Sequence, residues 1–167
     1  MKDALANLTI FRGLEKQERE QLLSIAHEHE VSVGDYIITQ GKMKRNLWFM
    51  LSGRCQVTRR TESGCQLKLA ELGPTVQFGE MSFFHAAPHS ADVIALSDME
   101  LLRLDRDDKL IESNSPIAFK LAQNALEQLS NRLRRTDQWI TELVCGEDHK
   151  PTVSEWTNFR ELIFRGQ

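Results

Sequence analysis

The residues with the most chemical content lie in the stretch Phe78–Ala95. Gly79 and the carboxylate of Glu80 open a short run that we expect to form one helical turn. Backbone N–H groups at the start of such a turn have no internal partner and can hold an anion. The polar pair His89-Ser90 follows after a loop. This spacing suits a ligand that has a phosphate at one end and a sugar hydroxyl at the other. The hydroxyl would donate a hydrogen bond to the carboxylate of Glu80.

The stretch resembles the phosphate-binding cassette of the cyclic-nucleotide-binding family, whose pattern is Phe-Gly-Glu, a short apolar helix, then Arg-Ser/Thr-Ala. Phe78-Gly79-Glu80 and Ser90-Ala91 match that pattern. Gly34–Gly41 is similar to the family's entry strand, Leu47–Gly53 to its second strand, and Leu126–Ile140 to its long dimer helix. The resemblance covers about residues 8–143. It implies a mainly β fold with flanking helices, namely a jelly-roll-like β-roll followed by a long C-terminal dimerisation helix.

The chain departs from the family pattern at His89, where the pattern has the phosphate-pairing arginine. Arginine carries a permanent charge and a fork of donors, whereas histidine is mostly neutral near pH 7. Losing a charge-assisted pair of hydrogen bonds is expected to cost roughly 1.5–3 kcal/mol. Three outcomes stay open: weak cyclic-nucleotide binding, binding of another anion such as a cyclic dinucleotide, or a structural remnant that binds nothing.

The resemblance implies a set of ligand-binding residues that comprises Phe78, Gly79, Glu80, Met81, Ser82, His89, Ser90, Ala91 and Thr136. In family members a residue at the position of Thr136 reaches the nucleotide base across the dimer. Several of these residues also have plainer interpretations: Met81 with Phe83 and Phe84 as core, and Glu80 as a turn-stabilising carboxylate. The basic cluster Arg132, Arg134 and Arg135 is interpreted as a solvated helix face, with contact to an anion as the minority interpretation.

Three sections of different texture succeed one another along the chain. Residues 1–30 are rich in helix formers and predict helices. Short apolar runs separated by turn residues follow, and their spacing is typical of a sandwich or barrel. The predicted strands are Tyr36–Thr39, Leu47–Leu51, Cys55–Arg59, Leu67–Leu72, Ala91–Leu96 and Glu100–Leu104. Glu62-Ser63-Gly64 gives the clearest hairpin turn, because glycine supplies the positive φ that such loops need.

The third section starts with Ser115-Pro116, a typical helix-start pair. Apolar or small residues then recur in heptad steps, at Ala122, Leu126, Leu129, Leu133, Thr136, Ile140 and Leu143. This narrow seam favours coiled-coil-like pairing, hence a homodimer through residues 116–143, over packing of the helix on its own β domain. We therefore expect a β-roll with N-terminal helices at 1–113, a dimerisation helix at 114–144 and a short helical tail at 145–167.

The tail is expected to form an amphipathic helix over Thr152–Arg165, with Thr152 or Ser154 as its cap and a protein partner as its possible target. Val144–Gln167 is too short for a winged helix-turn-helix and lacks a basic recognition helix, so we expect no direct DNA binding. The net charge of −3 agrees with that expectation.

Composition and motifs exclude several other classes. No long apolar run predicts a membrane span or secretion signal. Cys55, Cys65 and Cys145 suit free thiols in a reducing cytoplasm. We expect no enzyme activity, cofactor or metal; His27 and His29 are placed at the end of a helix, where they share no face. The sequence thus predicts a stand-alone cytoplasmic sensor for cyclic AMP or cyclic GMP. The alternative is a degenerate fold that serves as a protein-interaction module or binds another anionic ligand.

Overall fold

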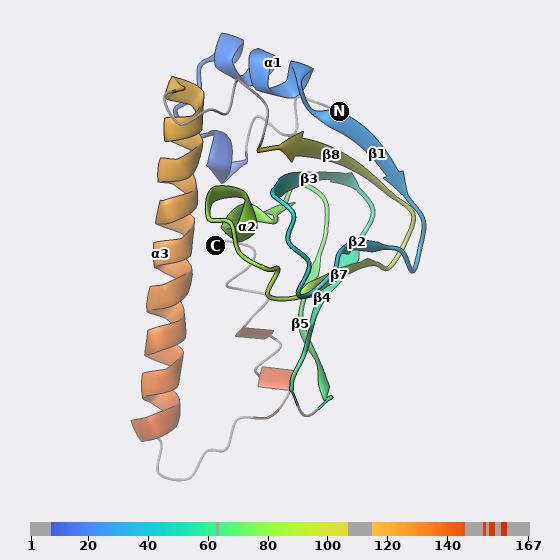
Figure 1. The fold of residues 1–167 in the computed structure, drawn as a ribbon. Helices are drawn as coiled ribbons and strands as arrows, with labels where there is room; N and C mark the ends of the chain where they lie inside the picture. The colour runs from blue at the N-terminus through green and yellow to red at the C-terminus, as the bar shows by residue number, and fades with distance from the viewer. Residues whose placement is uncertain are drawn as a thin grey trace.

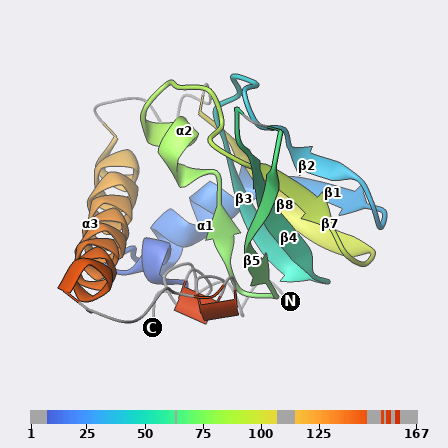
Figure 2. The same ribbon diagram turned by 90° about the horizontal axis from the view of Figure 1, so that it is seen from below.

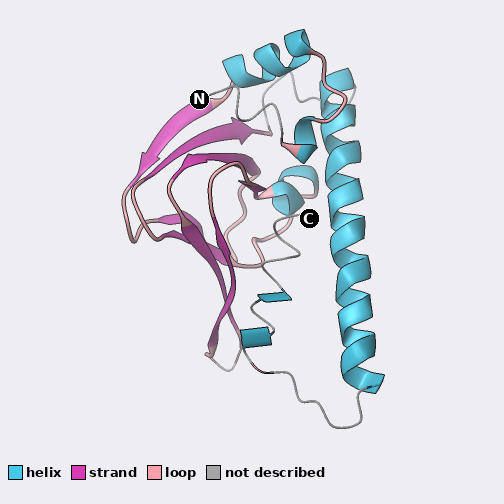
Figure 3. Ribbon diagram, turned by 180° about the vertical axis from the view of Figure 1, so that it is seen from behind, coloured by secondary structure: helices cyan, strands magenta, loops and turns pink. Residues whose placement is uncertain are grey.

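The structure is a computed structural model that describes residues 8–62, 64–106 and 115–145, together with 152, 154, 155, 158 and 159; side chains at 143–145 are not described. The described residues form two four-stranded antiparallel sheets, with helices gathered on one side of them (Figures 1 and 3). One sheet has the strand order β1-β8-β3-β6 and the other β2-β7-β4-β5. The predicted β-roll with a long C-terminal helix is therefore confirmed.

The elements in chain order are the 3-10 turn η2 (Thr9–Phe11), α1 (Lys16–Ser24), β1 (His27–Val31), β2 (Tyr36–Ile38), β3 (Asn46–Ser52), β4 (Cys55–Arg60), β5 (Gln66–Leu72), β6 (Gln77–Phe78), α2 (Glu80–Phe84), β7 (Asp92–Ala95), β8 (Met99–Asp105) and α3 (Pro116–Cys145). Each predicted strand corresponds to an observed one within a few residues. The predicted hairpin joins β4 to β5, which pair antiparallel from Cys55–Leu72 to Arg60–Gln66; its Ser63 lies outside the described residues.

Two strands were missed, and the helical prediction for residues 1–30 is wrong at its end. Residues 27–31 form β1, an edge strand that pairs with β8. Their alternating charged residues are too polar to stand out as a strand, and only pairing with β8 makes them one. His27 and His29 consequently share a face of a strand: His27 Nε2 lies 3.8 Å from Asp105 Oδ2, and the His29 ring packs 5.3 Å from that of Trp48. The short strand β6 also carried no sequence signal.

Strand β3 separates the two hydrophobic cores. Leu47 and Phe49 face the core under the helices, whereas Trp48 and Met50 face the core between the sheets. Successive strand residues point to opposite faces, so a strand with a core on each side is a continuous apolar run, as Leu47–Leu51 is.

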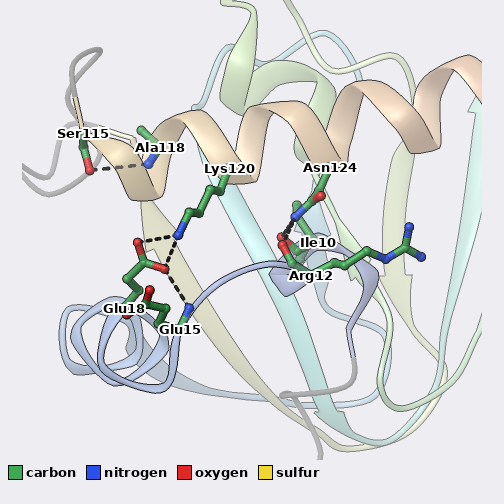
Figure 4. A network of polar contacts seen from close by, with 8 residues as sticks. All are labelled: Ile10, Arg12, Glu15, Glu18, Ser115, Ala118, Lys120 and Asn124. Atoms are coloured by element: carbon green, nitrogen blue, oxygen red, sulfur yellow. Dashed lines mark hydrogen bonds and ion pairs between the residues drawn. The ribbon is translucent and has the colours of Figure 1, made fainter.

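Polar contacts fix α3 against the N-terminal segment (Figure 4). Lys120 Nζ lies 2.8 Å and 2.7 Å from the two carboxylate oxygens of Glu18. Asn124 Nδ2 donates to the carbonyl oxygens of Ile10 and Arg12 at 2.9 Å and 2.7 Å. These contacts hold the first half of α3 in place, and the rest of α3 runs past α2 (Figures 1 and 2).

The buried face of α3 carries Ile117, Ala118, Leu121 and Ala125, which belong to the core under the helices. A second face is exposed: Phe119, Leu126, Leu133 and Ile140 are all open to solvent. Phe119 lies one seam position before Ala122, and the seam residues Ala122, Leu129 and Thr136 are half-buried. Helix α3 thus packs on its own domain through one face and leaves part of the predicted seam exposed.

Candidate ligand-binding site

Gly79 is the N-cap of α2, at the predicted start of the helical turn. Its φ of +90° is a conformation that side-chain-bearing residues rarely adopt. A Cβ atom at this position would lie 2.5 Å from the carbonyl oxygen of Asn46. Phe83 N donates to Gly79 O at 3.1 Å and closes the first helical turn. Glycine is therefore required both for the turn and for the close approach of β3.

The side chains of α2 divide between core and solvent. Glu80, Ser82 and Phe83 are buried, and Phe84 is half-buried with its ring 5.0 Å from that of Phe83. Met81 is 52 % exposed, so its interpretation as a core residue is wrong. Of the five residues of α2, Met81 is the one that points to solvent, while Glu80 and Phe83, three residues apart, share a buried face.

The buried Glu80 forms an ion pair with α3. Arg132 Nη1 donates to Glu80 Oε1 at 3.1 Å, and the Glu80 and Arg132 side chains are only 9 % and 19 % exposed. Thr136, one turn further along α3, donates from Oγ1 to the carbonyl oxygen of Arg132 at 2.9 Å. The fold thus brings Glu80 close to the helix segment that contains Thr136.

Sequence reasoning missed Arg132 as a site residue. It precedes Thr136 by four positions and so shares its helix face. That spacing is the signal that would have singled out Arg132 from the neighbouring Arg134 and Arg135.

His89 is buried and held at both its backbone and its ring. His89 N donates to Lys42 O at 2.9 Å, and Gly41 N donates to His89 O at 2.9 Å. The ring Nδ1 shares a hydrogen bond with Ser82 Oγ at 3.0 Å. Burial, and secondly the charge of Lys44, lower the pKa of His89 below its usual value. The imidazole is therefore neutral at pH 7 and offers hydrogen bonds there rather than a charge.

The remaining predicted residues of the cassette lie just before α2 and just before β7. Phe78 is buried at the end of β6, Ser90 is exposed and Ala91 is half-buried before β7. Beyond them, Asp92 is fully buried. Its Oδ1 accepts from Gln40 N at 2.7 Å, and its Oδ2 lies 3.4 Å from Arg60 Nε. Asp92 therefore anchors the end of the cassette to the strands on either side.

The assembled site is a short glycine-initiated helix with a buried carboxylate, a neutral histidine and an arginine from the long helix. Its groups can bind hydroxyls and an anion. No cluster of three or more His, Cys, Asp or Glu side chains suited to a metal occurs in the described part of the chain.

The protein is thus a β-roll domain with a long C-terminal helix, in which a short helix that begins at a glycine lies between the strands in sequence. Residues 28–111 match the family model described as "Cyclic nucleotide-binding domain". The match spans half of the chain, and the protein belongs to this family.

Curated relatives and a solved structure agree with this assignment. The "Cyclic AMP receptor protein" of Thermus thermophilus is 34% identical over 77% of this chain and 58% of the relative. The "CRP-like cAMP-activated global transcriptional regulator" of Mycobacterium tuberculosis is 26% identical over 86% of this chain and 63% of the relative. The crystal structure of the Thermus thermophilus catabolite activator protein aligns with a TM-score of 0.71 and 32% identity, covering 81% of this chain and 63% of that one. The chain therefore spans about three fifths of these relatives' length.

Proposed function

We propose that this protein is a non-catalytic regulatory module that binds a cyclic mononucleotide, cyclic AMP or cyclic GMP, in the β-roll and passes the signal to α3. The ligand-binding residues proposed are Phe78–Ser82, His89–Ala91 and Thr136, with Arg132 added from the geometry. The relatives whose names refer to cyclic AMP support the choice of ligand class.

The Glu80–Arg132 ion pair carries this proposal. It joins the helix of the cassette to the long helix, and both side chains are largely buried. A ribose hydroxyl that donates to Glu80, or a phosphate that accepts from Arg132, competes for the same atoms. A ligand that rearranges this pair necessarily has a different affinity for different placements of α3, which is the requirement for signalling.

His89 sets the expected affinity. A neutral imidazole already bonded to Ser82 replaces the fork and charge of an arginine. We therefore assign to Arg132 the permanent positive charge that pairs with the ligand phosphate. Binding is expected to be in the micromolar range and to tighten as the pH falls, since a bound phosphate favours the protonated imidazole.

Isothermal titration calorimetry tests the proposal with cyclic AMP, cyclic GMP and cyclic di-GMP at pH 6 and pH 8. We expect saturable binding of a mononucleotide that is stronger at pH 6 and is lost in Glu80→Gln. The matched control is Glu127→Gln, which removes an exposed carboxylate of α3 that is paired with Arg12. If binding is independent of pH, His89 does not contact the phosphate. If neither mononucleotide gives a heat of binding, the proposal is contradicted.

The alternative function is a degenerate fold that acts as a protein-interaction module or takes another anion, such as a cyclic dinucleotide. The burial of His89 and its bond to Ser82 favour it, because a structural role explains both. His89→Arg separates the two. If this change confers strong cyclic AMP binding, the pocket is otherwise intact; if it confers none, the interaction module is the better account.

We further propose that the module is a cytoplasmic homodimer paired through residues 116–143, and that the C-terminal tail contacts a protein partner rather than DNA or a membrane. The exposed heptad seam of α3 supports the pairing. In the described part of the tail, Thr152 Oγ1 accepts from Glu155 N at 3.3 Å, as a helix cap does, and Phe159 stacks 4.8 Å from Trp139 of α3. None of the described helices has the length and apolar character needed to cross a bilayer.

A further inference from the structure

A hollow opens beside His89. It has a volume of about 660 Å³ and is lined by residues of β1, β2, β3 and β8 and of the loop after β2. Strands β1 and β2 lie at the side of the molecule away from α3 (Figures 1 and 2). A volume of this size is in the range of small-molecule sites. Of its lining residues, only His89 belongs to the site described above.

The lining is rich in positive charge. Lys42 and Lys44 reach it from the loop after β2, and Arg103 from β8. Among the described residues, no carboxylate lies within ion-pair distance of either lysine. Arg103 is paired with Asp105 at 2.9 Å, and Asp35, the carboxylate in the lining, accepts a hydrogen bond from Ser32 N at 3.2 Å. The net excess of cations stands out on a chain whose overall charge is −3.

Two neutral imidazoles, His29 and His89, also line the hollow. The pKa of His29 is lowered by burial and secondly by Arg103, and that of His89 by burial and Lys44. His29 Nε2 is buried without a hydrogen-bond partner among the described residues. A buried polar atom that has no partner is costly unless a ligand or water satisfies it.

Apolar and aromatic groups form another part of the wall. The Trp48 ring centroid lies 5.3 Å from that of His29 and 5.9 Å from the guanidinium carbon of Arg103. Val31 and Ile37 add aliphatic surface. A flat hydrophobic surface beside unpaired cations suits a ligand with an aromatic body and an acidic group.

We propose that this hollow is a second ligand site, separate from the cyclic-nucleotide cassette, that takes a small aromatic anion carrying a carboxylate or phosphate group. The acidic group pairs with Lys42 and Lys44, the ring packs against Trp48, and His29 Nε2 gains a partner. The site also reaches the cassette. Both backbone hydrogen bonds between the Gly41-Lys42 segment and His89 cross from one site to the other, so occupancy of the hollow adjusts His89 and with it nucleotide affinity.

NMR titration of the ¹⁵N-labelled full chain with phenyl phosphate, benzoate and inorganic phosphate tests the proposal. We expect saturable shifts of the Trp48 indole N–H, assigned with Trp48→Phe, for the two aromatic anions and much weaker effects from inorganic phosphate. The double variant Lys42→Gln/Lys44→Gln should bind about tenfold more weakly, the effect of removing two exposed charge contacts. Lys16→Gln, an exposed lysine on α1, is the matched control and should bind normally.

Comparison with Glu80→Gln distinguishes this site from the proposed nucleotide site. Binding of phenyl phosphate should persist in Glu80→Gln, even where cyclic-nucleotide binding is absent. Phenyl phosphate binding that is lost in Glu80→Gln, or that is unchanged in the double lysine variant, would overturn the proposal. So would the absence of saturable shifts at Trp48 with both aromatic anions. The lysines are exposed, so their replacement is expected to leave the fold intact.

Discussion

The Glu80 carboxylate and the Arg132 guanidinium, 52 residues apart in sequence, lie 3.1 Å from each other in a largely buried contact between α2 and α3. This contact is the described ion pair that joins the cassette to the long helix. It ties the position of α2 to that of α3.

Breaking the pair from one side is expected to destabilise the protein. Glu80→Gln or Arg132→Gln alone should each lower the free energy of unfolding by about 3 kcal/mol, because a buried charge is left without its partner. The double variant should cost less than the sum, because neither charge remains. Urea unfolding measures these values. The exposed pair of Arg12 and Glu127 is the control, and its single variants should each cost less than about 1 kcal/mol. Additive effects at Glu80 and Arg132 would show that the two side chains are not coupled.

Gly79→Ala should be more damaging than its backbone conformation alone explains. Gly79 and Gly34 share a φ of +90°, but a Cβ atom at Gly79 would meet Asn46 O at 2.5 Å, whereas at Gly34 it would meet nothing within 4 Å. We expect Gly34→Ala to cost about 1 kcal/mol from strain, and Gly79→Ala to cost about 1–3 kcal/mol more from the displacement of β3 or α2. Thermal or urea unfolding of the two variants checks this. Equal losses would mean that the contact with Asn46 is relieved without cost.

Stability should decrease when the pH falls below about 6.5, the unfolded pKa of histidine. The pKa values of His29 and His89 are lowered in the folded state, chiefly by burial. In the window from 6.5 down to the folded pKa, the unfolded chain binds more protons, so acidification favours unfolding. His29→Gln/His89→Gln should therefore flatten the dependence of the urea midpoint on pH between 7.5 and 5.5. His85→Gln, at an exposed position, serves as the control. An unchanged slope in the double variant would assign the pH dependence to other groups.

The exposed seam of α3 predicts the oligomeric state. Leu126→Lys/Leu133→Lys should convert a dimer to a monomer in light scattering coupled to size exclusion, since charge is not tolerated in a coiled-coil seam. Asn131→Lys adds a lysine at an exposed position outside the seam and should leave the dimer intact. A wild-type protein that is monomeric at high concentration would contradict the pairing.

The family pattern in the sequence predicted the position of the helical turn correctly, at Glu80–Phe84. Gly79 is the start of α2, and Phe83 is core, because glycine and large apolar residues have strong local preferences. Met81 was misplaced because a five-residue helix is too short for its sequence to reveal which side is buried. Arg132 was missed because its partner Glu80 is far away in sequence, and only the packing of α3 beside α2 makes them neighbours.

Elements with a strong side-chain periodicity could be predicted from the sequence alone. The apolar run of β3, the heptads of α3 and the Ser115-Pro116 helix start each follow from side-chain spacing and local backbone preference. The other features depend on contacts between residues far apart in the chain. The polar stretch of β1 is a strand because β8 supplies its hydrogen bonds. The pairing of Arg132 with Glu80 and the neutral state of His89 depend on burial and on residues far away in sequence. Burial and charge pairing are properties of the packed chain rather than of the single residue.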